Sequence, residues 1–190
     1  MIFVVILFLC GIIRLRDLVI RMNLWTGLLI FLIIWLIVFI IIEIIIIRVR
    51  EKKIYEEYEY LDTQFEESKA CILESIGIID RYNEAEADSL SKSYRDIKRS
   101  VISNQSLSDL FMMIDRISLS RKDSTSLSRN KDYKDIRDLL IGYKDRINNS
   151  LDRYNVYVTN FNNKVFSLPT YAVSFFLRIL PYSELTIDKE

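Results

Sequence analysis

The stretch Leu24–Ile47, LWTGLLIFLIIWLIVFIIIEIIII, decides how the rest of this chain can fold. Glu43 is its single ionisable residue, so a helix built from it would be apolar on nearly every face. A helix rises about 1.5 Å per residue, so the stretch would be roughly 36 Å long and would exceed the roughly 30 Å hydrocarbon core of a bilayer. Residues 24–47 are therefore predicted to form one transmembrane helix, with the lipid bilayer as the first partner of the protein.

Positive charges on either side of the span predict its orientation, because basic flanks stay on the cytoplasmic side. Four basic residues follow the span: Arg48, Arg50, Lys52 and Lys53. Three precede it: Arg14, Arg16 and Arg21. If translation starts at Met22, none precedes it. The balance favours a single-pass protein of the cell membrane whose helical domain is cytoplasmic.

Residues 1–23 begin with an apolar run, MIFVVILFLCGII, and continue into a basic stretch. As a helix this run would reach only about 20 Å, which is too short to cross a bilayer alone. We interpret residues 1–23 as a leader that lies in or against the membrane. One alternative is lipidation at Cys10, although Leu9 stands where a lipoprotein box has a small residue. The other is a start at Met22, which would exclude the leader from the protein.

Composition excludes several classes of function. The 190 residues contain 26 Lys+Arg and 26 Asp+Glu, so no basic excess points to nucleic acid as a partner. The chain has no histidine, which excludes a histidine general base, Ser-His and Cys-His pairs and histidine-ligated metals. Only 4 glycines and 2 prolines interrupt the chain, and this scarcity of helix breakers favours long helices.

Four segments after the span carry apolar residues at every third or fourth position, which is typical of helices with one buried face. They run from Ile54 to Ile79, from Leu90 to Val101, from Leu110 to Ile117 and from Tyr133 to Val165. Asp88 or Ser89 is predicted to cap the second helix, and Ser106 or Ser108 the third. The predicted fold class is all-α: an N-terminal transmembrane helix followed by an antiparallel four-helix bundle over residues 48–168, with long first and last helices.

Residues 169–190 are predicted to form a separate apolar segment and tail. Pro169 is expected to end the last helix, because proline cannot continue it. Between Thr170 and Leu180 only Arg178 is charged. This composition favours a segment that folds back on the bundle, and the alternative is that it dips into the membrane surface beside the span.

A recognisable motif lies in the last predicted helix, where Arg153-Tyr154-Asn155 is followed at fixed spacing by apolar residues and a second asparagine. The pattern RYNxxVxxFNxxVxxLP resembles the C-terminal signature of the LemA family, RYNxxVxxYNxxIxxFP. Its signature residues are Arg153, Tyr154, Asn155, Val158, Phe161, Asn162, Val165 and Pro169. Downstream, Pro181-Tyr182 looks like the family's final P-Y pair, but the closing aromatic is missing. The family's second-helix segment is barely visible around Arg81 and Asp88.

The chain is accordingly identified as a divergent member of the LemA family. The resemblance implies a four-helix bundle on a membrane anchor and a bacterial source. It implies no established enzymatic activity, and hence no catalytic, cofactor-binding or metal-binding residues and no cofactor.

The motif also has a physical interpretation that does not depend on the family. Tyr154, Val158, Phe161 and Val165 lie on the apolar face of the helix, and two asparagines seven positions apart share the neighbouring face. We expect Asn155 and Asn162 to hydrogen-bond across a helix interface and fix its register. The alternative is that they contact a partner.

Three functions follow from these features. The leading hypothesis is a membrane-anchored interaction or scaffold module that binds unidentified protein partners. The second is a self-associating coiled-coil adaptor or sensor, in which the apolar faces are buried between copies. The third is an enzyme that uses Glu84, Glu86 and Asp88, but no glycine loop, metal-spaced ligands or nucleophile lie near them. An enzyme is therefore not expected.

Overall fold

The computed structural model describes residues 24–120 and 126–187, and every regular element in these ranges is helical. The elements are α2 (Leu24–Asp80), α3 (Glu84–Lys98), α4 (Asn104–Leu119), the short 3-10 helix η2 (Leu127–Arg129), α5 (Lys131–Phe166) and α6 (Thr170–Leu177). The all-α prediction is confirmed for the part of the chain described. The leader, its lipidation at Cys10 and the question of Met22 lie outside these residues.

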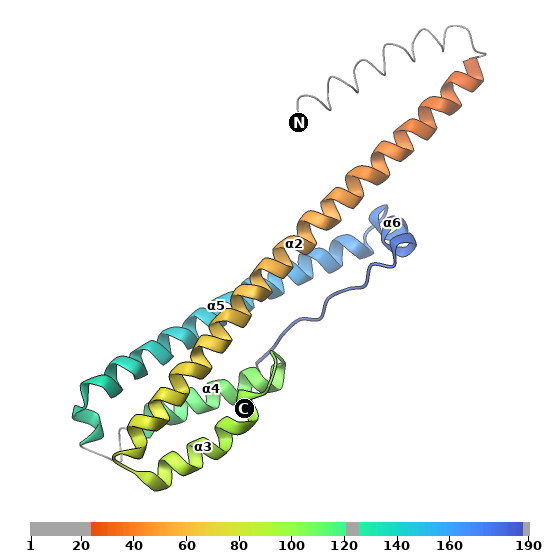
Figure 1. The fold of residues 1–190 in the computed structure, drawn as a ribbon. Helices are drawn as coiled ribbons and strands as arrows, with labels where there is room; N and C mark the ends of the chain where they lie inside the picture. Colours follow the sequence, from red (N-terminus) through yellow and green to blue (C-terminus); the bar gives the residue numbers. More distant parts are fainter. Residues whose placement is uncertain (1–23, 121–125, 188–190) are drawn as a thin grey trace. The chain divides into compact units, whose positions relative to one another are not determined.

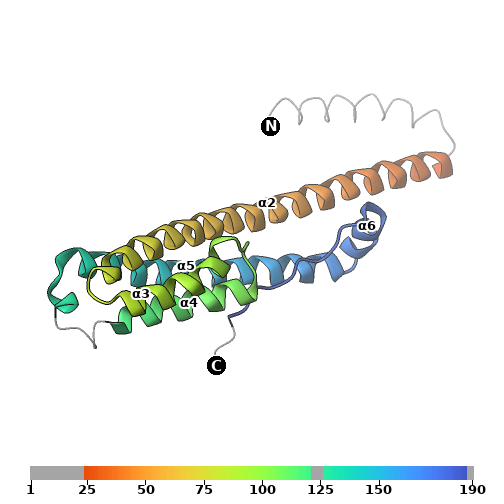
Figure 2. The ribbon, with the colours of Figure 1, turned by 60° about the horizontal axis from the view of Figure 1, so that its bottom comes forward.

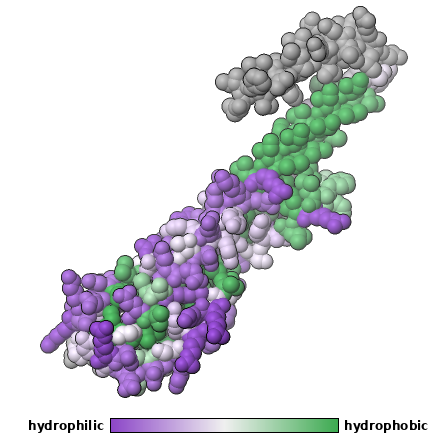
Figure 3. Space-filling view, in the orientation of Figure 1, coloured by the Kyte–Doolittle hydropathy of each residue, from purple (hydrophilic) through white to green (hydrophobic). Residues whose placement is uncertain are grey.

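The predicted transmembrane helix is the first part of a longer one. Helix α2 continues without a break from the apolar stretch to Asp80, consistent with the absence of proline along it. Contacts within the chain divide it into two compact units, Met1–Ile47 and Arg48–Glu190. By length and composition, α2 is the one helix among the described residues that could cross a membrane. Figure 3 shows apolar residues covering its N-terminal part.

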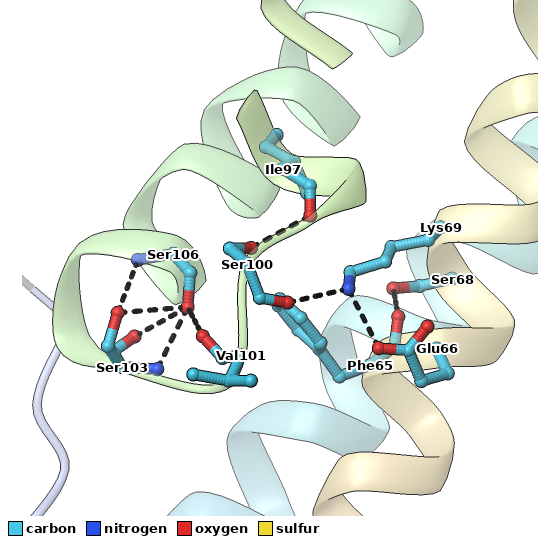
Figure 4. Close-up of polar contacts among 9 residues, drawn as sticks. All are labelled: Phe65, Glu66, Ser68, Lys69, Ile97, Ser100, Val101, Ser103 and Ser106. Carbon is cyan, nitrogen blue, oxygen red and sulfur yellow. Dashed lines mark hydrogen bonds and ion pairs between the residues drawn. The ribbon is translucent and has the colours of Figure 1, made fainter. Parts of the chain in front are cut away.

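Two helix starts differ from those predicted. Helix α3 begins at Glu84, where Asn83 Oδ1 accepts a hydrogen bond from Glu86 N, so Asp88 and Ser89 lie inside the helix. Its first-turn glutamates suit the positive end of the helix dipole. Helix α4 begins at Asn104, and Ser103 caps it through a reciprocal capping box with Ser106, which Figure 4 shows. The sequence pattern misplaced both starts because several neighbouring residues could each serve as a cap.

The second unit is built around α5. Helix α3 packs against α4, α4 against α5, and α5 also contacts η2 and α6, as Figures 1 and 2 show. The buried residues fall on the predicted apolar faces, although Tyr58 and Tyr143 are only half-buried. Val101 is also an exception, because it lies beyond the end of α3 and is 78% exposed. The buried face of α5 consists of Tyr133, Ile136, Leu140, Ile147, Ser150, Leu151, Tyr154, Val158, Phe161 and Val165.

A buried lysine joins α2 to the turn between α3 and α4 (Figure 4). Lys69 is only 4% exposed, and its Nζ donates to Glu66 Oε1 at 2.7 Å and to the Ser100 carbonyl at 2.9 Å. The ammonium also lies 4.5 Å from the centre of the Phe65 ring. A buried charge costs free energy unless it is paired and hydrogen-bonded, and these three contacts meet that condition.

The chain after α5 has two different parts. Helix α5 ends at Phe166, and α6 follows the cis peptide bond between Leu168 and Pro169. From Ile179 onward the chain is extended, and Figures 1 and 2 show it running back along α5 toward α4. Leu185 and Ile187 pack against the hydrophobic core. The tail therefore folds back on the helices, while α6 leaves most of its large side chains exposed.

Burial of the signature face predicts a large stability loss when its aromatic is truncated. Phe161 is 1% exposed, so Phe161→Ala should lower the free energy of unfolding by about 3–5 kcal/mol, the usual loss for a buried large aromatic. Denaturant unfolding of the full chain in detergent, followed by circular dichroism, would measure it. The matched control is Phe166→Ala on the same helix, which is 57% exposed and should change stability by about 0.5 kcal/mol or less. Equal losses in the two variants would contradict this assignment of the core.

Candidate functional site

The signature residues occupy two faces of α5 and the turn that follows it. Tyr154, Val158, Phe161 and Val165 are buried, as their spacing predicts. Pro169 precedes the first residue of α6. The remaining three residues, Arg153, Asn155 and Asn162, point away from the apolar face and make polar contacts.

Arg153 links α5 to α2 through Glu57. Glu57 Oε1 accepts hydrogen bonds from Arg153 Nε at 3.0 Å and from Ser150 Oγ at 2.6 Å, and Arg153 Nη2 lies 2.8 Å away. The hydrogen bond with Glu57 raises the pKa of the Arg153 guanidinium, which stays charged in any case. At the next position of each helix, the rings of Tyr154 and Tyr58 lie 6.0 Å apart. These contacts set the register of the two helices.

The two asparagines bind the extended tail. Asn155 Nδ2 donates to the Leu185 carbonyl at 2.6 Å, and Leu185 N donates back to Asn155 Oδ1 at 2.9 Å. Asn162 makes the same pair of bonds with Tyr182, at 2.8 Å and 3.0 Å. The expectation that these asparagines bond across a helix interface is therefore wrong. The extended chain after α6 covers their face of α5. Its main-chain N–H and C=O groups need hydrogen-bond partners, and no neighbouring strand supplies them.

The spacing of the two pairs matches the geometry of a helix lying against an extended chain. Seven residues of helix, from Asn155 to Asn162, cover about 10.5 Å. Three residues of extended chain, from Tyr182 to Leu185, cover about 10 Å. The two segments run in opposite directions, because the higher asparagine number pairs with the lower tail number. A seven-residue asparagine repeat can therefore bind every third residue of an extended chain without distorting either partner.

A third asparagine binds the same tail from α4. Asn104 Oδ1 accepts from Thr186 N at 2.9 Å, and Asn104 Nδ2 donates to Thr186 Oγ1 at 3.1 Å. Neighbouring tail residues Leu185 and Thr186 thus bond to two different helices. We call Asn104, Asn155 and Asn162 the asparagine clamp, and residues 182–187 the tail segment.

Side chains of the tail segment add fewer contacts than its main chain. The Tyr182 ring meets Phe161 edge to face, with centroids 5.2 Å apart. Tyr154 Oη donates to the Ser183 carbonyl, and Thr159 Oγ1 donates to Glu184 Oε1 at 2.6 Å. Burial is the main cause of the raised pKa of Tyr154, so its hydroxyl stays protonated as a donor at neutral pH. Because the clamp binds main-chain groups, its recognition depends little on tail sequence.

The tail segment borders a groove between α4 and α5, and this groove continues beyond it. A hollow of about 760 Å³ between α4 and α5 is bordered by the tail residues Leu185, Thr186 and Ile187. Asn148 lines it, seven positions before Asn155 and so on the same face of α5. Its other lining residues from the helices are Gln105, Ser108, Phe111, Met112, Asp115, Lys144, Leu151, Asp152 and Asn155. The face of α5 that carries the asparagines therefore extends beyond the part that the tail segment covers.

Hydrogen bonds by themselves would hold the tail segment only marginally. Eight hydrogen bonds among the described residues join it to α4 and α5. At about 0.5–1.5 kcal/mol each, they contribute roughly 4–12 kcal/mol. Ordering six residues costs about 1–2 kcal/mol each, or roughly 6–12 kcal/mol. Because these terms nearly cancel, the apolar contacts of Leu185 and Ile187 decide whether the tail stays bound.

Groups with chemical reactivity do not converge anywhere in the part of the chain described. Glu84 and Glu86 lie in the first turn of α3, and Glu86 forms an ion pair with Arg116 at 3.1 Å. Asp88 is exposed one turn further along. Burial, followed by Glu74 and Glu67, raises the pKa of the Cys71 thiol, which disfavours the reactive thiolate. Within residues 24–120 and 126–187, no cluster of three or more Cys, Asp or Glu could hold a metal ion.

Sequence reasoning missed Asn104 and the tail segment as parts of one site. Asn104 lies between two of the predicted helices, after Val101 and before Leu110, and nothing local distinguishes it from its polar neighbours. The tail did carry a local signal, since Ser183, Leu185 and Ile187 alternate with Tyr182, Glu184 and Thr186 in the period-2 pattern of extended chain.

Comparisons with known proteins do not place this chain in a family. Neither a protein-family model nor a curated protein matches it. The function must therefore be inferred from the residues of the chain itself.

Removing single clamp asparagines should expose single tail amides. Asn162→Ala should raise the hydrogen-exchange rate of the Tyr182 amide about fivefold, and Asn155→Ala that of the Leu185 amide, because each amide loses a hydrogen bond worth about 1 kcal/mol. Residue-resolved exchange on the full chain would measure both rates. Asn163→Ala, at an exposed neighbouring position of α5, is the control and should leave both amides protected. Unchanged rates in the first two variants would refute the clamp.

Proposed function

We propose that this protein is a membrane-anchored helical interaction module whose asparagine clamp binds extended polypeptide. In this proposal residues 24–47 form the single transmembrane span, and the basic residues that follow it favour a cytoplasmic helical unit. The clamp carries the proposal, because three amide side chains each bond to the main chain of one extended segment. A groove that recognises main chain and extends past its occupant is suited to bind other extended segments.

The architecture that supports this module is an antiparallel four-helix bundle formed by α3, α4, α5 and the second part of α2. Arg50 Nη1 donates to the Asn160 carbonyl at 3.0 Å, and further along α2 Glu57 bonds with Ser150 and Arg153 of α5. Residue numbers thus rise along α2 while those of their partners fall along α5, as in antiparallel helices. The apolar faces are buried within the chain, which favours a closed bundle over a coiled coil formed between copies.

The proposal gives the LemA-like signature a physical role. Its apolar residues pack α5 into the bundle, its arginine sets the register against α2, and its asparagines face the groove. Membership of a divergent LemA branch is supported by this shared pattern of residues. On this basis the signature residues are binding and packing residues, and the protein carries out no reaction of its own.

Anchoring by the span is tested by extraction. The full chain should remain in the membrane pellet after an alkaline carbonate wash, because roughly 24 apolar residues suffice to span the hydrocarbon core. A chain that starts at Arg48 lacks the span and should appear in the supernatant. Recovery of the full chain in the supernatant would remove the membrane anchor from this proposal.

Binding of an extended peptide is tested with the tail sequence as probe. In the full chain reconstituted in nanodiscs, Leu185→Asp with Ile187→Asp should release the tail, because both side chains pack against the core. A labelled peptide of residues 179–190 should then bind about tenfold more tightly than to the unaltered chain, measured by fluorescence anisotropy. Adding Asn155→Ala and Asn162→Ala should abolish this gain, while adding Asn163→Ala should preserve it. A peptide that binds equally well without the clamp asparagines would overturn the proposal.

A further inference from the structure

Six large apolar side chains are exposed together around the end of α5 and α6. We call Phe166, Leu168, Phe175, Phe176, Leu177 and Leu180 the apolar cap; Phe176 is 83% exposed. Helix α6 buries only Thr170, Val173 and Ser174 and leaves its two phenylalanines outside. A soluble surface rarely gathers so many large apolar groups without a partner.

Contacts inside the second unit place this cap at the end where the chain arrives from the span. Arg50, three residues after Ile47, bonds to the Asn160 carbonyl of α5. Phe166 follows only six residues later, about 9 Å further along the helix. On the other side of the cap, Tyr182 bonds to Asn162 and its ring packs against Phe161, the residue after Asn160, so this ring lies near the first residues of the unit. The chain on both sides of the cap therefore lies near residues that follow shortly after Ile47.

We propose that the apolar cap inserts into the interface of the bilayer that the span crosses, as a second membrane contact of this chain. The inference rests on the proposed membrane anchor, since Ile47 then ends the span and Arg48 marks the membrane surface. Any group within about 10 Å of that point lies at the depth where an interfacial helix buries its apolar face. We therefore assign lipid as the partner that covers the cap, because the chain itself holds the cap close to the membrane surface.

The charges around the cap fit a lipid surface. Arg178 ends α6 in the left-handed conformation with φ 54° and is exposed. Lys52 and Lys53 are exposed on α2, close to the same end of the unit. Phenylalanine and leucine side chains below a rim of basic groups match acyl chains below headgroup phosphates. The second contact would limit how far the helical unit can swing about its anchor.

Spin labels on the full chain in nanodiscs test the proposal, in a background with Cys10→Ala and Cys71→Ala whose helicity is checked by circular dichroism. A label at Phe176→Cys should be relaxed about threefold or more by oxygen relative to a water-soluble nickel reagent, as expected for a site a few ångströms into the lipid. The matched control is Val101→Cys, which is 78% exposed and lies beside Ser100, the partner of Lys69. It should favour the nickel reagent.

A label at Ile37→Cys separates this inference from the proposed function. If position 37 reports lipid while position 176 favours the nickel reagent, the anchor stands and the cap proposal fails. If position 176 is shielded from both reagents, a protein surface covers the cap and the lipid assignment is wrong. If position 37 itself reports water, the anchor fails as well.

A second variant keeps the proposal falsifiable if the label at Phe176 perturbs α6. Phe175→Gln with Phe176→Gln should move a label at Leu180→Cys from lipid to water, reversing its preference between oxygen and nickel reagents. Val156→Gln, at an exposed position of α5 outside the cap, should leave that label in lipid. A label at position 180 that ignores both changes would overturn the role of the phenylalanines.

Discussion

The apolar face of α5 is the surface on which the second unit depends. Along its 36 residues this helix packs against α4, η2 and α6, and its side chains contact α2 and the tail segment. Burial of large side chains such as Tyr133 and Phe161 supplies the main driving force, since each buried aromatic contributes several kcal/mol. Because α5 is a regular helix, burying this face also fixes the direction in which each of its other faces points. The asparagines face the groove because they lie one step around the helix from the core.

Asparagine suits the role that it has in the clamp. Its side-chain amide carries one acceptor oxygen and one donor nitrogen, which is the same pair of groups as a peptide bond. It can therefore satisfy both the N–H and the C=O of one extended residue, as an adjacent strand would. Aspartate offers no donor at neutral pH, so it would leave the carbonyl of Leu185 or Tyr182 without its partner. The clamp replaces a missing β-strand with side chains from helices.

The cover that the tail segment gives to the groove connects structure with the proposed function. A groove for extended chain must be protected when empty, because unpaired polar groups and apolar surface both favour non-specific association. The chain's own tail provides that cover, with hydrogen bonds that roughly offset the cost of ordering it and apolar contacts of Leu185 and Ile187 that add to them. The end of the covered region at Tyr182 lies beside Asn162, two residues after Asn160, whose carbonyl accepts a hydrogen bond from Arg50.

The sequence by itself determined the helical class, the apolar span and the buried faces, because helix periodicity and hydropathy are properties of residues fewer than about eight positions apart. It also indicated that Asn155 and Asn162 share a face. Only the tertiary structure decided what that face meets, since the clamp joins residues separated by 20, 30 and 82 positions. The buried ammonium of Lys69 and its partner Ser100 are 31 positions apart, and no local pattern marks that lysine as internal. Long-range pairing of polar groups depends on how packed helices place them, and a one-dimensional pattern carries no information on that placement.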